Sequence, residues 1–272
     1  MSICWDFPFR GTGNQQGSNN AAITMFAGSG VMDGLAREVC QNSLDAKDRD
    51  LGDDVPVKVK FSLSYIDRDS YEVFSGYETA LDGCFDYWEN HPDRNQALDD
   101  FLNTKRAYLN QTSIPVLTMS DYNTIGLEGV NPLPGQKSYW NLLANTEGLS
   151  GKQDDSSGGS FGIGKFAPFA YSGLNMVFYN TFAKDGGRAL QGVTHLVTSQ
   201  RPGEDGVYPT SATGKYLYLI NPLIGRGISP DDNCPLAELD CFAREEHGTE
   251  SPSLDLSCRN TKAGKQQPPS PL

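Results

Sequence analysis

The chain of 272 residues contains no long apolar segment and no cluster of cysteines or histidines. No apolar run approaches the roughly 18 residues that a membrane-spanning helix requires. The six cysteines include no C-x-x-C pair and the three histidines lie far apart, so the sequence indicates neither a metal site nor a disulfide framework. The first residues lack the basic and then apolar stretch of a signal peptide. We therefore expect a soluble, cytoplasmic protein with free thiols and no membrane contact.

Positive charge is also scarce. Lys and Arg number 22 against 34 Asp and Glu, which gives a formal net charge of −12. A surface this acidic repels phosphate backbones, so direct DNA binding by this chain is disfavoured. The hydrophobic content of 38% is enough for a core, whereas 29 Gly and 16 Pro indicate many loops in one large domain or two small ones.

A stripe of polar side chains on one predicted helix is the first candidate site. The segment Leu35–Ala46 fits a helix, with Asp33 as its expected N-cap. Glu38, Asn42 and Asp45 then fall at i, i+4 and i+7 on one face. Such groups are unfavourable to bury without partners, which favours a polar ligand above the stripe. The alternative is a stripe that simply faces solvent, and the spacing alone favours that alternative.

Several further segments set the expected organisation. Residues 1–30, rich in Gly, Asn, Gln and Ser, predict an N-terminal arm ahead of a single domain at 31–249. Val55–Tyr65 alternates apolar and polar residues, which predicts a strand with one buried and one wet face. Residues 71–109 are acidic and helix-like, as in a helical insertion. The polar, Pro- and Ser-rich residues 250–272 predict a disordered or irregular tail.

A glycine-rich loop is the second candidate site. The letters GGSFGIGK space Gly159, Gly162 and Gly164 so that backbone N–H groups can approach an anion, and Lys165 adds a cation. This chemistry suits a polyphosphate. The spacing also fits a P-loop, but Phe166 stands where a P-loop needs Ser or Thr for magnesium, and no apolar strand precedes the loop, so we reject that assignment.

Four motifs now occur in a fixed order: Glu38, Asn42, Asp45 and Ala46 on the helix; Asp121 after the apolar run IPVLTMS; the glycine loop; and Gly248–Thr249. In this combination the chain resembles the Bergerat-fold ATPases, which include DNA gyrase B, Hsp90, histidine kinases and MutL. It looks most like bacterial MORC, MutL and Hsp90-like proteins. The resemblance implies an α/β two-layer sandwich with a mixed, mostly antiparallel sheet, helices on one face, and a lid over the nucleotide at about 148–165.

The resemblance also implies residue roles. Glu38 would orient the attacking water as general base, and Asn42 would coordinate magnesium. Asp121 would accept a hydrogen bond from the adenine amino group, with support from Thr249. The remaining positions implied to contact the nucleotide are Asp45, Asn123, Gly126, Gly159, Gly162, Ile163, Gly164 and Lys165.

The chain departs from the family pattern in two places. Asn123 stands where the family has glycine, and Gly126 comes one residue late; since Asn tolerates positive φ, we expect the turn to survive. After Gly248–Thr249 the family adds a closing strand and, in hydrolysing branches, a second domain. Only 23 dissimilar residues follow here, so the resemblance implies a chain that is cut short.

These features lead to competing functional hypotheses. The first is a magnesium-dependent ATPase whose lid closure drives homodimerisation through the N-terminal arm, as the module of a bacterial defence or DNA-transaction system with an effector partner. The second is a nucleotide-gated binding module with little turnover, because a catalytic lysine often comes from the second domain. The third is a protein kinase of the same superfold. The fourth is an α/β domain whose glycine loop binds no ligand. Measurements of ATP binding and phosphate release distinguish these hypotheses.

Overall fold

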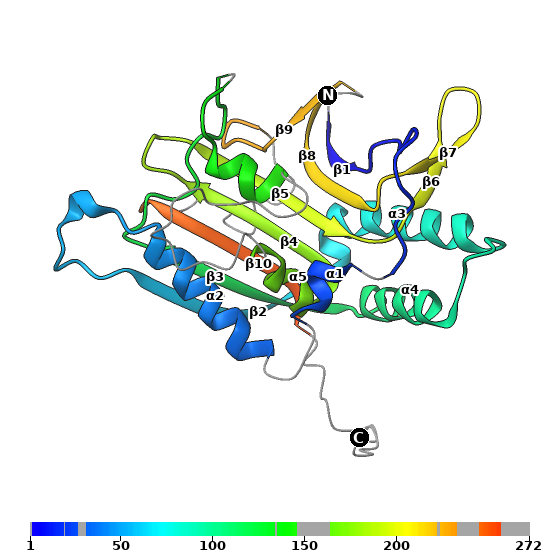
Figure 1. Ribbon diagram of the computed structural model, residues 1–272, viewed down its shortest axis with the longest axis horizontal. Coiled ribbons are helices and arrows are strands. Elements are labelled where there is room, and N and C mark those ends of the chain that lie inside the picture. Colours follow the sequence, from blue (N-terminus) through cyan, green and yellow to red (C-terminus); the bar gives the residue numbers. More distant parts are fainter. Residues whose placement is uncertain are drawn as a thin grey trace, which may run out of the picture.

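A computed structural model describes residues 2–18, 20–26, 31–133, 135–145, 164–221, 224–232 and 245–256 (Figure 1). The α-helices are α1 (Ala21–Thr24), α2 (Val31–Asp45), α3 (Glu72–Trp88), α4 (Gln96–Leu109) and α5 (Ala167–Tyr171). Short helical turns are η1 (Arg49–Leu51), η2 (Arg68–Ser70), η3 (Asn141–Asn145) and η4 (Gly164–Phe166). The strands are β1 (Ser2–Asp6), β2 (Lys58–Asp67), β3 (Ser113–Tyr122), β4 (Ser172–Phe182), β5 (Arg188–His195), β6 (Ser199–Pro202), β7 (Val207–Thr210), β8 (Thr213–Asn221), β9 (Ile224–Arg226) and β10 (Gly248–Leu256).

One large sheet forms the centre of the structure. Its strand order is β1-β8-β5-β4-β10-β3-β2, with β9 paired to β8, while β6 and β7 form a separate hairpin. The pairings among the described strands are antiparallel. The expectation of a mixed α/β fold with a largely antiparallel sheet is therefore confirmed at that level.

Helices cover both faces of this sheet. Successive strand residues point to opposite faces. On β4, Met176 and Phe178 pack with residues of α3 and α4, whereas Val177 and Tyr179 pack with α5 and the residues around η3. Helices α2 and α5 lie across the strands on this second side (Figure 1). The expected helices on one face are corrected to helices on both, because α3 and α4 are amphipathic and cover the other side.

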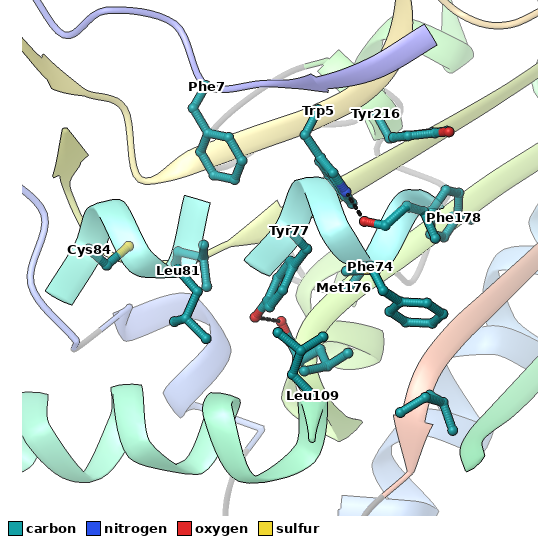
Figure 2. Close-up of a cluster of buried hydrophobic side chains, with 14 of the residues drawn as sticks. Trp5, Phe7, Phe74, Tyr77, Leu81, Cys84, Leu109, Met176, Phe178 and Tyr216 are labelled. Carbon is teal, nitrogen blue, oxygen red and sulfur yellow. Dashed lines mark hydrogen bonds between the residues drawn. The ribbon is translucent and has the colours of Figure 1, made fainter. Parts of the chain in front are cut away.

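The largest core cluster joins the N-terminal strand to α3 and the central strands (Figure 2). The Trp5 indole donates to the Val73 carbonyl at 2.9 Å, and the Tyr77 hydroxyl donates to the Leu174 carbonyl at 2.9 Å. Both side chains are buried. Residues 71–109 contain the predicted helices, as α3 and α4, and both helices contribute side chains to this core. In contrast to the predicted arm, residues 2–6 form β1, which pairs with β8 at one edge of the sheet.

The end of the described chain corrects the predicted tail. Residues 248–256 form β10, which is hydrogen-bonded to β4 on one side and β3 on the other. Pro252 lacks an N–H, and short polar residues surround it, so the local sequence argues against a central strand. The two neighbouring strands supply backbone partners along both edges and override that local preference. Residues 257–272 lie outside the described residues.

Two local predictions also differ from the structure. Helix α2 begins at Val31, so Asp33 lies in its first turn rather than at the N-cap. The strand predicted at Val55–Tyr65 is present as β2, but the face expected to be buried is exposed: Phe61, Leu63 and Tyr65 are 41%, 54% and 67% exposed. The reason is its place at the edge of the sheet, where α2 reaches only part of the strand.

These burial differences predict unequal effects of the same substitution. Leu81 on α3 is fully buried, and Leu63 on β2 is largely exposed. Leu81→Ala should lower the free energy of unfolding by about 2–5 kcal/mol because it leaves a cavity. Leu63→Ala should change it by less than about 0.5 kcal/mol. Urea denaturation at neutral pH measures both. Equal losses would mean that α3 is peripheral or that β2 is covered.

Candidate functional site

Backbone hydrogen bonds join the end of α2 to the turn after β3. The Asp48 N–H donates to the Asn123 carbonyl at 2.9 Å, and the Ile125 N–H donates to the Ala46 carbonyl at 2.9 Å. Lys47 forms an isolated antiparallel bridge with Thr124 between them. This junction brings the C-terminal end of α2 to the end of β3, although the two segments are far apart in the sequence.

Asp121 is the centre of the junction. Its Oδ1 accepts from the Thr249 N–H at 2.6 Å and from the Thr124 hydroxyl at 2.8 Å. The single proton of the Ser43 hydroxyl is shared between Asp121 Oδ2 at 3.3 Å and the Val39 carbonyl at 2.9 Å. Hydrogen bonds to a carboxylate are stronger than those between neutral groups, so the side chain is held in one orientation. The structure thus brings together the first, second and fourth motifs, carried by α2, β3 and β10.

The turn after β3 has two residues with positive φ. Asn123 has φ 62° and Gly126 has φ 66°, so the expectation that Asn123 adopts this conformation is confirmed. The Asn123 side chain donates to the Pro56 carbonyl at 2.7 Å, which directs it to the loop before β2. A Cβ on Gly126 would lie 2.9 Å from the Phe182 carbonyl oxygen, so glycine also fits the close approach to β4.

Glu38 and Asn42 are neighbours on α2, as the helical spacing predicts. The Asn42 side-chain amide donates to Glu38 Oε1 at 3.3 Å. Glu38 is half-buried, while Asn42 and Asp45 are exposed. An acid beside an amide on an accessible face provides oxygen ligands of the kind that magnesium prefers.

The end of the glycine loop touches this pair. Gly164 is buried, and a Cβ built on it would overlap the Glu38 carboxylate outright. Glycine at 164 therefore lets the chain pass directly against the acid. Gly159, Gly162 and Ile163 lie outside the described residues.

Lys165 extends away from the backbone into a buried position. It is 8% exposed, and its Nζ donates to the Leu142 carbonyl at 3.4 Å. The same atom lies 5.4 Å from the centre of the Phe166 ring. Leu142 belongs to η3, so the side chain of Lys165 bridges η4 and η3.

An ion pair supports the turn from the β4–β5 loop. Lys184 Nζ lies 2.5 Å from Asp48 Oδ1 and 2.5 Å from Asp50 Oδ2, and the Lys184 N–H donates to the Ile125 carbonyl at 2.9 Å. The hydrogen bond from Lys184 outweighs burial and lowers the pKa of Asp48 below its usual value. Asp48 is therefore charged at neutral pH, and the ion pair loses its contribution to stability as the pH falls through that lowered pKa.

Three residues that hold the site are not predicted from the sequence: Ser43 and Thr124, which bond Asp121, and Lys184, which bonds the turn. Ser43 follows Asn42 directly, but nothing in the sequence indicates that it meets a residue 78 positions later. A hydroxyl near an acid is too common a pattern to predict such a contact.

The part of the chain that the structure describes contains no group of three His, Cys, Asp or Glu side chains placed to hold a metal ion. None of its helices has the length and apolar character needed to cross a bilayer. The chain matches no family model, no curated protein and no solved structure. The geometry of the site therefore has to carry the functional argument.

The hydrogen bonds of Asp121 predict that replacing it destabilises the fold. Replacing Asp45, an exposed acid on α2, should have little effect. Asp121→Asn replaces an acceptor that serves three donors, so it should lower the free energy of unfolding by about 1–3 kcal/mol. Asp45→Asn should remain within about 0.5 kcal/mol of the parent, because Asp45 is exposed. Urea denaturation measures both, and an Asp121→Asn variant as stable as the parent would contradict the described bonding.

Proposed function

We propose that this chain is a Bergerat-type ATPase, which binds ATP with magnesium and hydrolyses it between α2, the turn after β3 and the lid. One observation carries the proposal: contacts made by α2 and by Asp121 link residues of all four sequence motifs. Asp121 binds the backbone of Thr249 and contacts α2, and Gly164 lies against Glu38 on the same helix. Motifs that matched the family pattern only by chance would have no reason to be in contact in the fold.

Asp121 suits recognition of an adenine ring. A carboxylate fixed by a backbone N–H and two hydroxyls has a defined direction for accepting a further hydrogen bond, such as that from an exocyclic amino group. The hydroxyls of Ser43 and Thr124 can rotate to act as donor or acceptor when a ligand enters. Recognition of the base therefore falls to the end of β3.

Glu38 and Asn42 suit the phosphate end. Asn42 would hold the magnesium ion, whose charge when bound would offset that of the phosphates. Glu38 would accept the proton of the attacking water, and its half-buried carboxylate lies beside the end of the lid at Gly164. A glycine there leaves room for Glu38 to approach a ligand.

The wider roles follow the same proposal. ATP-dependent closure of the lid would drive homodimerisation through residues after β1, and an effector protein in a defence or DNA-transaction system would respond to it. A nucleotide switch without turnover is the alternative outcome for the same site, and a single assay separates the two.

That assay measures ATP binding by calorimetry and phosphate release with magnesium, for the parent chain and for two variants. Glu38→Ala should retain binding but slow phosphate release by about 100-fold or more, the usual range for a general base. Asn42→Ala should weaken magnesium-dependent binding. Binding without release in the parent chain would make it a nucleotide switch. No binding at all by the folded parent chain would refute the proposal.

Gly164 provides a second test. Gly164→Ala should displace the Glu38 carboxylate while the fold is retained, because the end of a flexible side chain can move aside. Phosphate release should then fall by about 10–100-fold, with ATP binding largely kept. Gly34→Ala on α2 is the matched control, since a Cβ there meets no atom within 4 Å. Equal rates of phosphate release for the two variants would mean that Gly164 has no part in hydrolysis.

A further inference from the structure

A cavity lies on the other side of α5 from Glu38. It has a volume of about 560 Å³, within the range typical of small-molecule sites. Its walls come from the chain between β1 and α1, from η3, from the η4–α5 segment, and from β5 and β8. Ala167 and Tyr171 of α5 pack towards Leu35 of α2, whereas Phe166 and Phe169 line this cavity. The short helical segment therefore separates it from the Glu38 side.

The charge of the cavity is opposite to that of the chain. Arg10, Lys165, Lys215 and His195 line it, and none of the described lining residues is acidic. The whole chain carries a formal net charge of −12. Three cations gathered in one concave site on such an acidic protein create a local potential that attracts anions.

Burial strengthens this potential. Lys165 is 8% exposed, and Arg10 Nε is shielded from solvent without a hydrogen-bond partner in the described part of the chain. Burial, and then the charge of Lys165, lower the pKa of His195 to about 4, so its ring is neutral at pH 7. Asp6 faces Lys215 across the β1–β8 pair but does not line the cavity.

The apolar part of the wall is aromatic. Phe9, Phe166 and Phe169 line the cavity, and the Phe169 ring lies 4.6 Å from that of His195 in an edge-on arrangement. Rings placed in this way favour a flat, apolar partner by stacked or edge-to-face contact. Amide side chains such as Asn14 also line it and can bind polar substituents.

We propose that this cavity, the cationic pocket, is a ligand site for a small organic anion with a flat apolar body, such as an aromatic carboxylate or phosphate ester. The anionic group binds Arg10, Lys165 and Lys215, and the ring lies among the three phenylalanines. The pocket lies apart from Glu38 and Asp121 of the proposed nucleotide site, and Lys165, which follows the glycine loop, lines this pocket instead. The proposal does not depend on ATP binding.

Calorimetry on the full chain with benzoate and phenyl phosphate tests the proposal. Benzamide and inorganic phosphate serve as matched probes that lack, respectively, the charge and the ring. The aromatic anions should bind, the other two should bind at least about tenfold more weakly, and the NMR signals of the His195 ring should shift on binding. Equal binding of inorganic phosphate, or no binding of either aromatic anion, would overturn the proposal.

Substitutions of lining residues test whether the aromatic anions bind in this cavity. Arg10→Gln and Lys215→Gln should each weaken it by about tenfold or more, as expected for loss of a charged hydrogen bond. Lys58→Gln, on the exposed edge strand β2, should not change it. Circular dichroism confirms that each variant is folded. Unchanged affinity in both pocket variants, or displacement of the probe by ATP, would refute a separate site. Asp121→Asn should leave this binding intact even if ATP binding fails.

Discussion

The bonding of the Asp121 carboxylate is the interaction on which the candidate site depends. Its two oxygens receive donors from α2, from the turn after β3 and from β10. Those segments come from three distant parts of the sequence, and no covalent link holds them together. A charge that is held by several hydrogen bonds in one orientation also resists rearrangement, since each lost donor leaves a polar group unsatisfied. The proposed nucleotide site therefore rests on hydrogen bonds within the chain itself.

The central strands divide the molecule into two sides with different uses. On one side, Trp5, Tyr77 and Phe178 belong to a dry aromatic core with α3 and α4 (Figure 2). On the other side, the same sheet carries Asp121, which belongs to the candidate site, and Val193 and Lys215, which line the cationic pocket. Because alternate residues of a strand face opposite ways, one sheet can stabilise the fold with one face and present polar groups with the other.

Three strands differ from their sequence-based predictions for physical reasons. Residues 250–256 of β10 fall in the predicted tail because Pro252 and short polar residues have low strand preference, but the neighbouring strands β3 and β4 bond β10 on both edges. β1 was predicted as part of an arm because the glycine-rich segment that follows it hid the short apolar pattern around Trp5. β2 was predicted correctly as a strand, yet alternation cannot tell an edge strand from a covered one.

The sequence by itself determined the local features. Helical spacing placed Glu38 beside Asn42, the apolar run led to Asp121 at the end of a strand, and Asn123 accepted the positive φ of its turn. These depend on backbone periodicity and local sterics, which neighbouring residues decide. Only the tertiary structure decided that Ser43 bonds Asp121, that helices cover both faces, and that three cations distant in sequence gather in one cavity. Such contacts depend on how distant segments pack, and no local pattern encodes that.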